Sequence, residues 1–503
     1  MPKLDEDAVE FRAAGHRMID WVADYLEGVE RYDVLSRQAP GETASRFAAA
    51  PSEGGKSYEA LLAELQSSIM PGITHWNHPA FFAYFSITGS QAGILGELLS
   101  AALNVNGMLW KTSPSVTELE RLVLEWLRAQ LGLPAGLFGI INDTASINTF
   151  LGLAAAREAL GLGIRADGMS GRELPQLRIY ASEHAHSSVD KAAYALGFGA
   201  RGVTRIPSDS AARMDADALR HAVARDLADG VRPCAIVATL GTTSSAAVDP
   251  LSAIVKIARD SRMWVHVDSA YAGSATIAPE FRWLWDGIDG ADSIVVNPHK
   301  WLFTPIDCSV LYTSRPDVLR ETFSLVPEYL KTSDGAEVNY MDYGLQLGRR
   351  FRALKLWMVL EHYGMEHLRE VIRGHIRMAA RLADELTRRN DVELLAPQLF
   401  SVVVFRLVIR SADGSIDEEG SEGATLAVLE KINASGRAFV SHTRLRGRYG
   451  IRVAIGNGAT EWRHVEAILD FVQGRAPSST VKGEPEIEVG KRTLRRDAAP
   501  PVK

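Results

Sequence analysis

Cysteine is scarce in this chain, which has only Cys234 and Cys308 among its 503 residues. Two thiols cannot build a disulfide framework in so long a chain, and both lie in apolar, strand-like runs. The pattern favours a reducing compartment. The N-terminus, MPKLDEDAVE, is acidic and has no apolar core, so no secretory signal peptide is expected.

Long apolar runs and an excess of positive charge are also missing. The apolar stretch that begins at Ala92 is broken by Glu97 and is too short to span a bilayer. The formal net charge is −7, which argues against the basic surface field of a nucleic-acid binder. With 46% hydrophobic and 23% charged residues, the composition is that of a large globular protein. We therefore expect a cytoplasmic protein that binds neither nucleic acid nor membrane.

Apolar residues at helical spacing between Asp5 and about Glu30 predict an N-terminal helix, and a second helix is expected from about Ser57. These helices could pack on another subunit as an arm or cover their own domain. The pattern leaves both open. We assign residues 1–88 to an N-terminal helical dimerisation segment.

Short apolar strands then alternate with helices in the part of the chain that we assign to a large domain, residues 89–355. Strands are expected at 139–141, 178–181, 202–206, 234–240, 263–267, 293–296 and 309–312. Such alternation predicts an α/β fold with a mostly parallel sheet that helices cover on both faces. A capping box at Ser115–Glu118 is predicted to open a helix that ends at Leu131.

The remaining chain predicts a small C-terminal α+β domain, residues 356–475, after a long helical region that runs to Arg389. Strands are expected at 401–407 and 451–454, and helices at 424–432 and 461–472. Residues 476–503 are rich in proline, serine and charge, which predicts a disordered tail. An interaction patch at its KRTLRR run is the alternative.

Polar residues gather where the predicted strands end. Because ligands bind beyond the carboxyl ends of the strands in an open parallel sheet, a site is expected at this edge. The polar segments that follow strands are Asn142–Ser146, Ser182–Ser188, Gly241–Ser244, Asp268 and Asn297–Lys300.

Asp268 and Lys300 follow two strands that are expected to be buried on both faces. A buried carboxylate is costly without a cationic partner. The two residues either form a structural salt bridge with each other or face one cationic aromatic ligand.

Pyridoxal 5'-phosphate (PLP) suits this set of groups. Its ring nitrogen needs a carboxylate, and its aldehyde needs a lysine as Schiff-base partner. Its phosphate needs free amides at a helix N-terminus, which the turn Asn142–Ser146 could supply, although alone that turn indicates an ordinary N-cap. The conjunction of all three is more specific than any one motif.

Rival motifs are weaker. His184 and His186 have the residue type of metal ligands, but no third ligand stands at a suitable spacing, so no metal is expected. Gly161-Leu162-Gly163 follows a predicted helix rather than a strand, which argues against dinucleotide binding. Neither a P-loop nor a nucleophile elbow is present.

Ordered motifs over about residues 5–475 resemble the group II PLP-dependent decarboxylases, specifically the aromatic-L-amino-acid decarboxylases. The resemblance implies a fold-type I, aspartate-aminotransferase-like architecture and a homodimer with active sites at the subunit interface. The motifs that carry it are His78-Pro79, Phe81–Phe85, Thr117–Glu120, Ala185–Ser188, Ala238–Thr243, His266–Gly273, Asn297–Trp301 and Leu347–Arg352.

The resemblance also implies roles for matching residues. Lys300 would carry the cofactor, and Asp268 would pair with its ring nitrogen. His186 and Ala270 would pack on the two ring faces, and His299 would help to position the lysine. The phosphate would be held by three residues with a fourth nearby: Ala145, Ser146, Asn297 and Thr243.

Tyr329 matches a tyrosine of the family's mobile catalytic loop, where it would return a proton to the substrate carbon after CO2 leaves. Relatives with phenylalanine at this position shift toward oxidative deamination to an aldehyde, so the tyrosine favours simple decarboxylation.

The resemblance further implies a substrate pocket with aromatic walls from Trp76, Tyr84 and Phe85. Gly348 would leave room for rings as large as indole and argues against histidine as substrate. Two positions depart from the family. Ile87 replaces a threonine that helps to hold the substrate carboxylate, with Thr88 next to it. Met108 replaces a phenylalanine that reaches in from the neighbouring subunit in animal members.

The sequence thus predicts a decarboxylase that converts an aromatic L-amino acid of the Trp, Tyr, Dopa or Phe type to its arylalkylamine and CO2. The nearest alternatives keep PLP: an aromatic aldehyde synthase, an aminotransferase, or a decarboxylase of a non-aromatic amino acid. A more remote alternative is an inactive homologue with a binding role, which the presence of both Lys300 and Asp268 disfavours.

Overall fold

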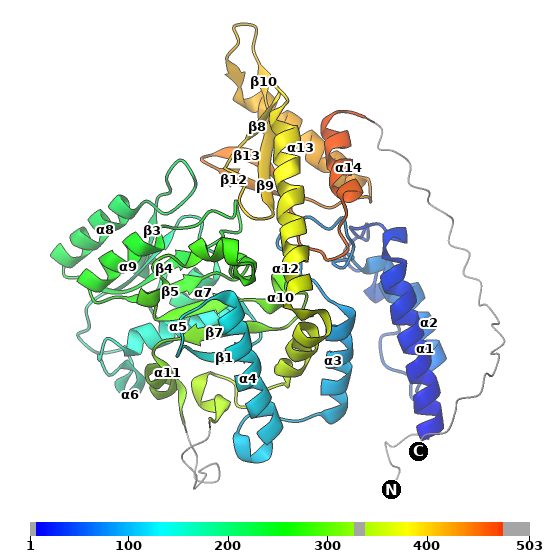
Figure 1. The fold of residues 1–503 in the computed structure, drawn as a ribbon, viewed down its shortest axis with the longest axis horizontal. Coiled ribbons are helices and arrows are strands. Elements are labelled where there is room, and N and C mark those ends of the chain that lie inside the picture. The colour runs from blue at the N-terminus through cyan, green and yellow to red at the C-terminus, as the bar shows by residue number, and fades with distance from the viewer. Residues whose placement is uncertain (1–6, 326–337, 476–503) are drawn as a thin grey trace.

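The computed structural model describes residues 7–325 and 338–475 (Figure 1). Its largest sheet has seven strands in the order β1-β7-β6-β5-β4-β2-β3. Strand β7 runs antiparallel to both of its neighbours, and the other pairings are parallel. The predicted mostly parallel α/β sheet is therefore confirmed. The strands are β1 Phe138–Asn142, β2 Leu177–Ser182, β3 Val203–Ile206, β4 Arg232–Thr239, β5 Trp264–Asp268, β6 Ser293–Val296 and β7 Ser309–Thr313.

Helices cover both faces of this sheet, so each strand contributes to two hydrophobic cores. Strand β4 shows the alternation: Ile236 and Ala238 pack in one core, and Ala235 and Val237 pack in the other. The first core is closed by α4 Pro114–Leu131, α8 Ala216–Ala228 and α9 Leu251–Asp260, and the second by α5 Ala145–Glu158, α7 Ser188–Ala195 and α11 Pro316–Phe323.

The predicted capping box at Ser115–Glu118 is wrong. Helix α4 begins at Pro114, and its N-cap is Ser113, two residues before the predicted cap Ser115; Ser113 makes no side-chain capping bond. Proline at the first helical position has a preset φ and needs no amide partner there, which fixes the start. The Glu118 carboxylate instead accepts a hydrogen bond from the indole nitrogen of Trp110 at 3.0 Å.

A second sheet of four strands, in the order β12-β13-β9-β8, forms the core of the C-terminal region with helices α13 and α14. Helix α12 leads into it from the large sheet and bends at Gly364, where φ is +69°. The predicted boundary between residues 355 and 356 falls within α12, and the domain division stays a prediction. The elements are α12 Arg352–Thr387, β8 Val392–Leu394, β9 Val402–Leu407, β10 Ile409–Arg410, β11 Ile416–Asp417, α13 Glu418–Ala434, β12 Ser441–Leu445, β13 Arg448–Ala454 and α14 Trp462–Val472.

The N-terminal helices α1, Ala8–Glu27, and α2, Tyr58–Glu64, lie side by side at one margin of the molecule (Figure 1). Helix α3, Gln91–Leu103, packs along α12, and the sequence patterns assigned no element there. Large apolar side chains of α1 and α3 remain exposed. Across the described ranges, no helix is both long enough and apolar enough to cross a membrane.

Candidate active site

A cavity of about 190 Å³ opens at the carboxyl ends of β4, β5 and β6. It brings together every residue that the sequence assigned to the cofactor, together with His299 and Phe85. Four further lining residues had been given no role of their own: Thr144, Thr239, Gly241 and Tyr271. The predicted residues in the lining are Phe85, Ala145, Ser146, His186, Thr243, Asp268, Ala270, Asn297, His299 and Lys300.

Lys300 and Asp268 share the cavity without bonding to each other. Asp268 is the last residue of β5, and Lys300 lies in the short helix α10, Pro298–Trp301, directly after β6. The structure describes both residues, and no ion pair or hydrogen bond joins them, so they do not form the alternative structural salt bridge. Burial lowers the pKa of Lys300, Asp268 raises it, and the charge of Arg452 lowers it further. The amine is thus left available as a nucleophile.

Both histidines of the cavity are held in one orientation by backbone amides. The Nδ1 atom of His186 accepts from the amide of Ser188 at 3.1 Å, and the Nδ1 atom of His299 accepts from the amide of Cys308 at 2.9 Å. Burial is the largest cause that lowers the pKa of His186, and it lowers that of His299 to about 3. Both imidazoles are therefore neutral near pH 7, with the proton on Nε2.

The N-terminus of α5 is free to hold an anion. Its N-cap, Thr144, makes no side-chain capping bond, and its hydroxyl donates to Asp143 at 3.0 Å. The first amides of this 14-residue helix thus lack a side-chain acceptor, and Ala145 and Ser146 line the cavity. Uncapped amides at a helix N-terminus form a binding site for phosphate.

A chain of buried side-chain hydrogen bonds supports Asn297 beside that helix. Asn142 donates to Asn148 at 2.7 Å, Asn148 donates to Ser309 at 2.7 Å, and Ser309 donates to Asn297 at 2.5 Å. The chain uses the Oδ1 acceptor of Asn297. Its amide group is thereby oriented by strand β7 and helix α5 together.

Two lining residues to which the sequence patterns assigned no role, Gly241 and Thr239, help to explain the shape and polarity of the cavity wall. Gly241 has φ +98°, and a Cβ atom there would lie 2.5 Å from the Cβ of Ala272, so only glycine fits. The hydroxyl of Thr239 is buried and has no hydrogen-bond partner among the described residues. An unsatisfied buried hydroxyl at a cavity wall points to a ligand that completes it.

Aromatic rings form the back of the cavity. Phe85 stacks on Tyr271 with centroids 3.8 Å apart, and Tyr271 stacks on Trp301 at 4.5 Å. The Nζ atom of Lys300 lies 5.3 Å from the centroid of Phe85. The tyrosine Tyr84, which precedes Phe85, is exposed and stacks on Trp76 at 6.0 Å.

The other residues predicted to bind substrate lie outside this lining. Ile87, Met108 and Gly348 do not border the cavity, and Met108 packs with Leu109 and Met341. Tyr329 falls outside the described residues. The hydroxyl of Thr88 donates to the carbonyl oxygen of Lys300 at 3.0 Å, so its one proton is already used inside the protein.

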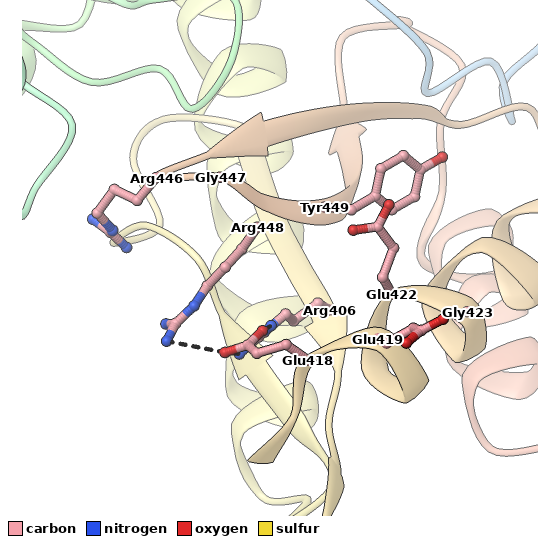
Figure 2. A pocket seen from close by; sticks show the side chains of 9 residues that line it. All are labelled: Arg406, Glu418, Glu419, Glu422, Gly423, Arg446, Gly447, Arg448 and Tyr449. Carbon is pink, nitrogen blue, oxygen red and sulfur yellow. Dashed lines mark hydrogen bonds and ion pairs between the residues drawn. The ribbon is translucent and has the colours of Figure 1, made fainter.

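A larger hollow of about 710 Å³ lies on the four-stranded sheet, called the small sheet below (Figure 2). Two of its arginines are paired: Arg406 and Arg448 each contact Glu418, which borders the hollow, and Glu393, which does not. None of the predicted catalytic residues borders it. Size therefore does not identify the active site here, whereas unpaired reactive groups do.

Metal ligation finds no support in the described ranges, where no group of three or more His, Cys, Asp or Glu side chains is placed to hold an ion. The two histidines weighed as ligands have other partners. His184 bonds to Ser208 at 3.2 Å, and His186 to Ser188 at 2.9 Å.

A lysine without an ion pair, a carboxylate in the same cavity and uncapped helix amides at one sheet edge are the donor set that PLP requires. The fold and the site define a fold-type I PLP enzyme. The chain belongs to the pyridoxal-dependent decarboxylase family, because the family model for the pyridoxal-dependent decarboxylase conserved domain matches residues 40–408. It is an amino-acid decarboxylase by family and uses PLP.

Individual relatives agree with this assignment. Tyrosine decarboxylase 4 of Petroselinum crispum is 41% identical over 93% of each chain. A phenylacetaldehyde synthase of Arabidopsis thaliana is 38% identical over 93% of this chain and 96% of its own. A crystal structure of Oryza sativa TDC with PLP and tryptamine superposes with a TM-score of 0.90 and 36% identity, covering 94% of this chain and 99% of that one.

Proposed function

We propose that this enzyme decarboxylates an aromatic L-amino acid to the corresponding arylalkylamine and CO2. The observation that carries the proposal is the stack of Phe85 on Tyr271, which presents an aromatic face 5.3 Å from the Lys300 amine. A flat apolar wall of this kind favours an aromatic side chain over a charged one. A tyrosine decarboxylase and a solved structure with tryptamine among the similar proteins support the same substrate class.

Different residues of the cavity would hold the different parts of PLP. Lys300 would hold it through the amine. Asp268 would offer a carboxylate to the ring nitrogen, and His186 and Ala270 would lie beside the ring. The amides at the start of α5, Ser146, Asn297 and Thr243 would hold the phosphate. Bound PLP supplies an electron sink for the breaking bond.

The chain's own groups then control two events at the substrate Cα atom. The site orients the Cα–carboxylate bond against the aromatic wall of Phe85. The electron pair of the broken bond finally receives a proton, which Tyr329 delivers, so CO2 and the amine are the only products. His299, neutral and fixed by the amide of Cys308, keeps Lys300 in place.

We further propose that two copies of the chain form a homodimer with shared active sites. Exposed apolar side chains on α1 and α3 support it, among them Val9 at 74%, Phe11 at 65% and Leu103 at 58%. A face of this kind marks a protein–protein interface. Met108 and Gly348 would then complete a substrate pocket from across the interface.

The domain division and the location follow the same proposal. Residues 1–88 act as the dimerisation segment, 89–355 bind PLP, and 356–475 form the small domain. Cys234 and Cys308 are both free and buried, which suits the reducing cytoplasm.

The test is a substrate panel with the PLP-loaded enzyme: Trp, Tyr, Dopa, Phe, 5-hydroxytryptophan, His and Glu. We expect CO2 from aromatic substrates, without stoichiometric peroxide or ammonia. Preference for Glu or His would overturn the aromatic pocket.

A second candidate is an aromatic aldehyde synthase, since a phenylacetaldehyde synthase is among the similar proteins. That reaction consumes dioxygen and releases peroxide and ammonia in step with CO2. Measuring all three products in one assay separates the two reactions.

A further inference from the structure

A buried arginine, Arg452, lies behind the wall of the cavity that contains Lys300. Arg452, on β13 of the small sheet, is 2% exposed and makes no ion pair with a carboxylate among the described residues. Its Nε donates to the carbonyl oxygen of Thr243, and its Nη1 to that of Tyr84. Its Nη2 has no partner in the part of the chain that the structure describes. Because an unpaired buried charge is costly, its presence calls for an explanation.

Tyr84, one of the acceptors of Arg452, has an unusual backbone. Its φ is +55°, a left-handed conformation that a residue with a bulky side chain adopts only when its surroundings hold it there. The amide of Tyr84 donates to the hydroxyl of Ser441 at 3.3 Å. Ser441 and Arg452 are cross-strand partners on β12 and β13. Two neighbours on adjacent strands, Ser441 and Arg452, thus bind both the amide and the carbonyl group of Tyr84.

The left-handed backbone at Tyr84 sets the directions of two aromatic side chains, those of Tyr84 and Phe85. Phe85 enters the cavity wall, with the Arg452 guanidinium 4.7 Å from its ring centroid. The side chain of Tyr84 is directed to the surface and is 51% exposed. A relaxed backbone at Tyr84 would move Phe85 away from Lys300 and from Tyr271.

We propose that Arg452 and Ser441 form a clamp through which the small domain positions the substrate wall. The clamp holds Tyr84 in its left-handed conformation and thereby sets Phe85 against the Lys300 amine. Arg452 is a positioning residue in this account, because it does not border the cavity. The inference deepens the proposed function and rests on it only for the identity of the substrate.

The charge of the clamp has a separate effect. Burial is the largest cause that lowers the pKa of Lys300; Asp268 raises this pKa, and the charge of Arg452 lowers it further. The two histidines that face the same amine, His186 and His299, are neutral near pH 7 because burial lowers their pKa values. Removing the charge of Arg452 should therefore move the pH-dependent change in the visible absorption of the holoenzyme to higher pH.

The experiment compares R452M, R452K and the control R448M as PLP-loaded enzymes. Arg448 lies on the same strand, is 38% exposed along its side chain and pairs with Glu393. We expect R452M to raise KM and to lower kcat/KM by about 100-fold, as misplaced pocket walls do. R452K should also raise KM, because one ammonium cannot reach both carbonyl groups. The absorption change should move upward in pH in R452M, but not in R452K or R448M.

A milder variant covers the case in which R452M does not fold. S441A removes one hydrogen bond of the clamp and should lower kcat/KM by about three- to tenfold, with the absorption change at its wild-type pH. The clamp is wrong if S441A has wild-type kinetics and R452M shifts neither KM nor the absorption change.

Tyr84 itself provides the sharpest control. Y84A removes the ring but keeps the backbone strain, whereas Y84G removes both. The loss caused by adding S441A should be smaller in Y84G than in Y84A. Equal losses in both backgrounds would overturn the clamp. If the wild type released no CO2 from any aromatic amino acid, the proposed function would fail, while the absorption change would still test Arg452.

Discussion

The molecule buries cations in two regions in opposite ways. In the hollow on the small sheet, Arg406 is 2% exposed but pairs with two carboxylates, Glu393 and Glu418. At the cavity of the large sheet, Arg452 is buried and Lys300 is partly buried, and the structure gives neither of them an ion pair among the described residues. Paired charges contribute to local structure, whereas an unpaired one persists where function requires it. The difference between paired and unpaired cations identifies the cavity at the large sheet, rather than the hollow on the small sheet, as the reactive site.

The largest effect on activity is expected from K300A, which removes the unpaired amine of the cavity. Without the amine the enzyme cannot attach its cofactor covalently or release it to the substrate, so kcat should fall by at least about 10⁴-fold. CO2 release under saturating PLP measures it. The matched variant K355A removes another buried lysine, one paired with Glu97, and should retain covalently bound PLP. Wild-type turnover by K300A would place the chemistry elsewhere.

D268N tests whether the negative charge of Asp268 is required in the cavity that contains Lys300. The substitution keeps the shape and removes the charge, so the ring nitrogen loses its partner and kcat should fall by about 10²- to 10³-fold. Single-turnover CO2 release measures the chemical step directly. A change confined to KM would assign Asp268 to substrate binding instead.

Acid should destabilise the protein through histidines that are buried neutral. Burial lowers the pKa of His266 and of His375 to about 4. The unfolded chain binds protons below about pH 6.5 that the folded protein resists, so stability is full above that pH and falls as the pH drops toward 4. Each such histidine should cost about 2 kcal/mol at pH 5. Urea unfolding at pH 7, 6 and 5 measures the slope, which H375Q should reduce.

The smallest effect should come from the paired region. E393Q weakens the contact with the buried Arg406 and should lower the free energy of unfolding by about 1 kcal/mol, because Glu393 is partly exposed. Its kcat/KM should equal that of the wild type. Denaturant unfolding and steady-state kinetics on one preparation measure both, and a large kinetic defect would remove the distinction between the two regions.

Much of the cavity could be predicted because parallel strands bring their carboxyl ends to one edge. Asp268 and the segment Asn297–Lys300 each follow a strand directly, so local pattern alone placed them together. Arg452 could not be found in this way. Its two acceptors lie 209 and 368 residues away in the chain, and only the packing of the small sheet brings them together.

Other misses have local causes. Proline at the start of α4 overrode a plausible capping box, because a preset φ fixes a helix start without a side-chain cap. Thr239 belongs to an apolar strand, and nothing in its neighbours reveals that its hydroxyl is left unsatisfied. Ile87, Met108 and Gly348 lie outside the cavity of this chain, and their predicted contact with substrate stays a prediction.

The central claim is that the unpaired amine of Lys300 holds PLP. Borohydride reduction of the holoenzyme, followed by peptide mapping, tests it most directly. The account predicts the reduced cofactor on Lys300 and on no other lysine. Label on Lys355 or another lysine, with Lys300 unmodified, would contradict it.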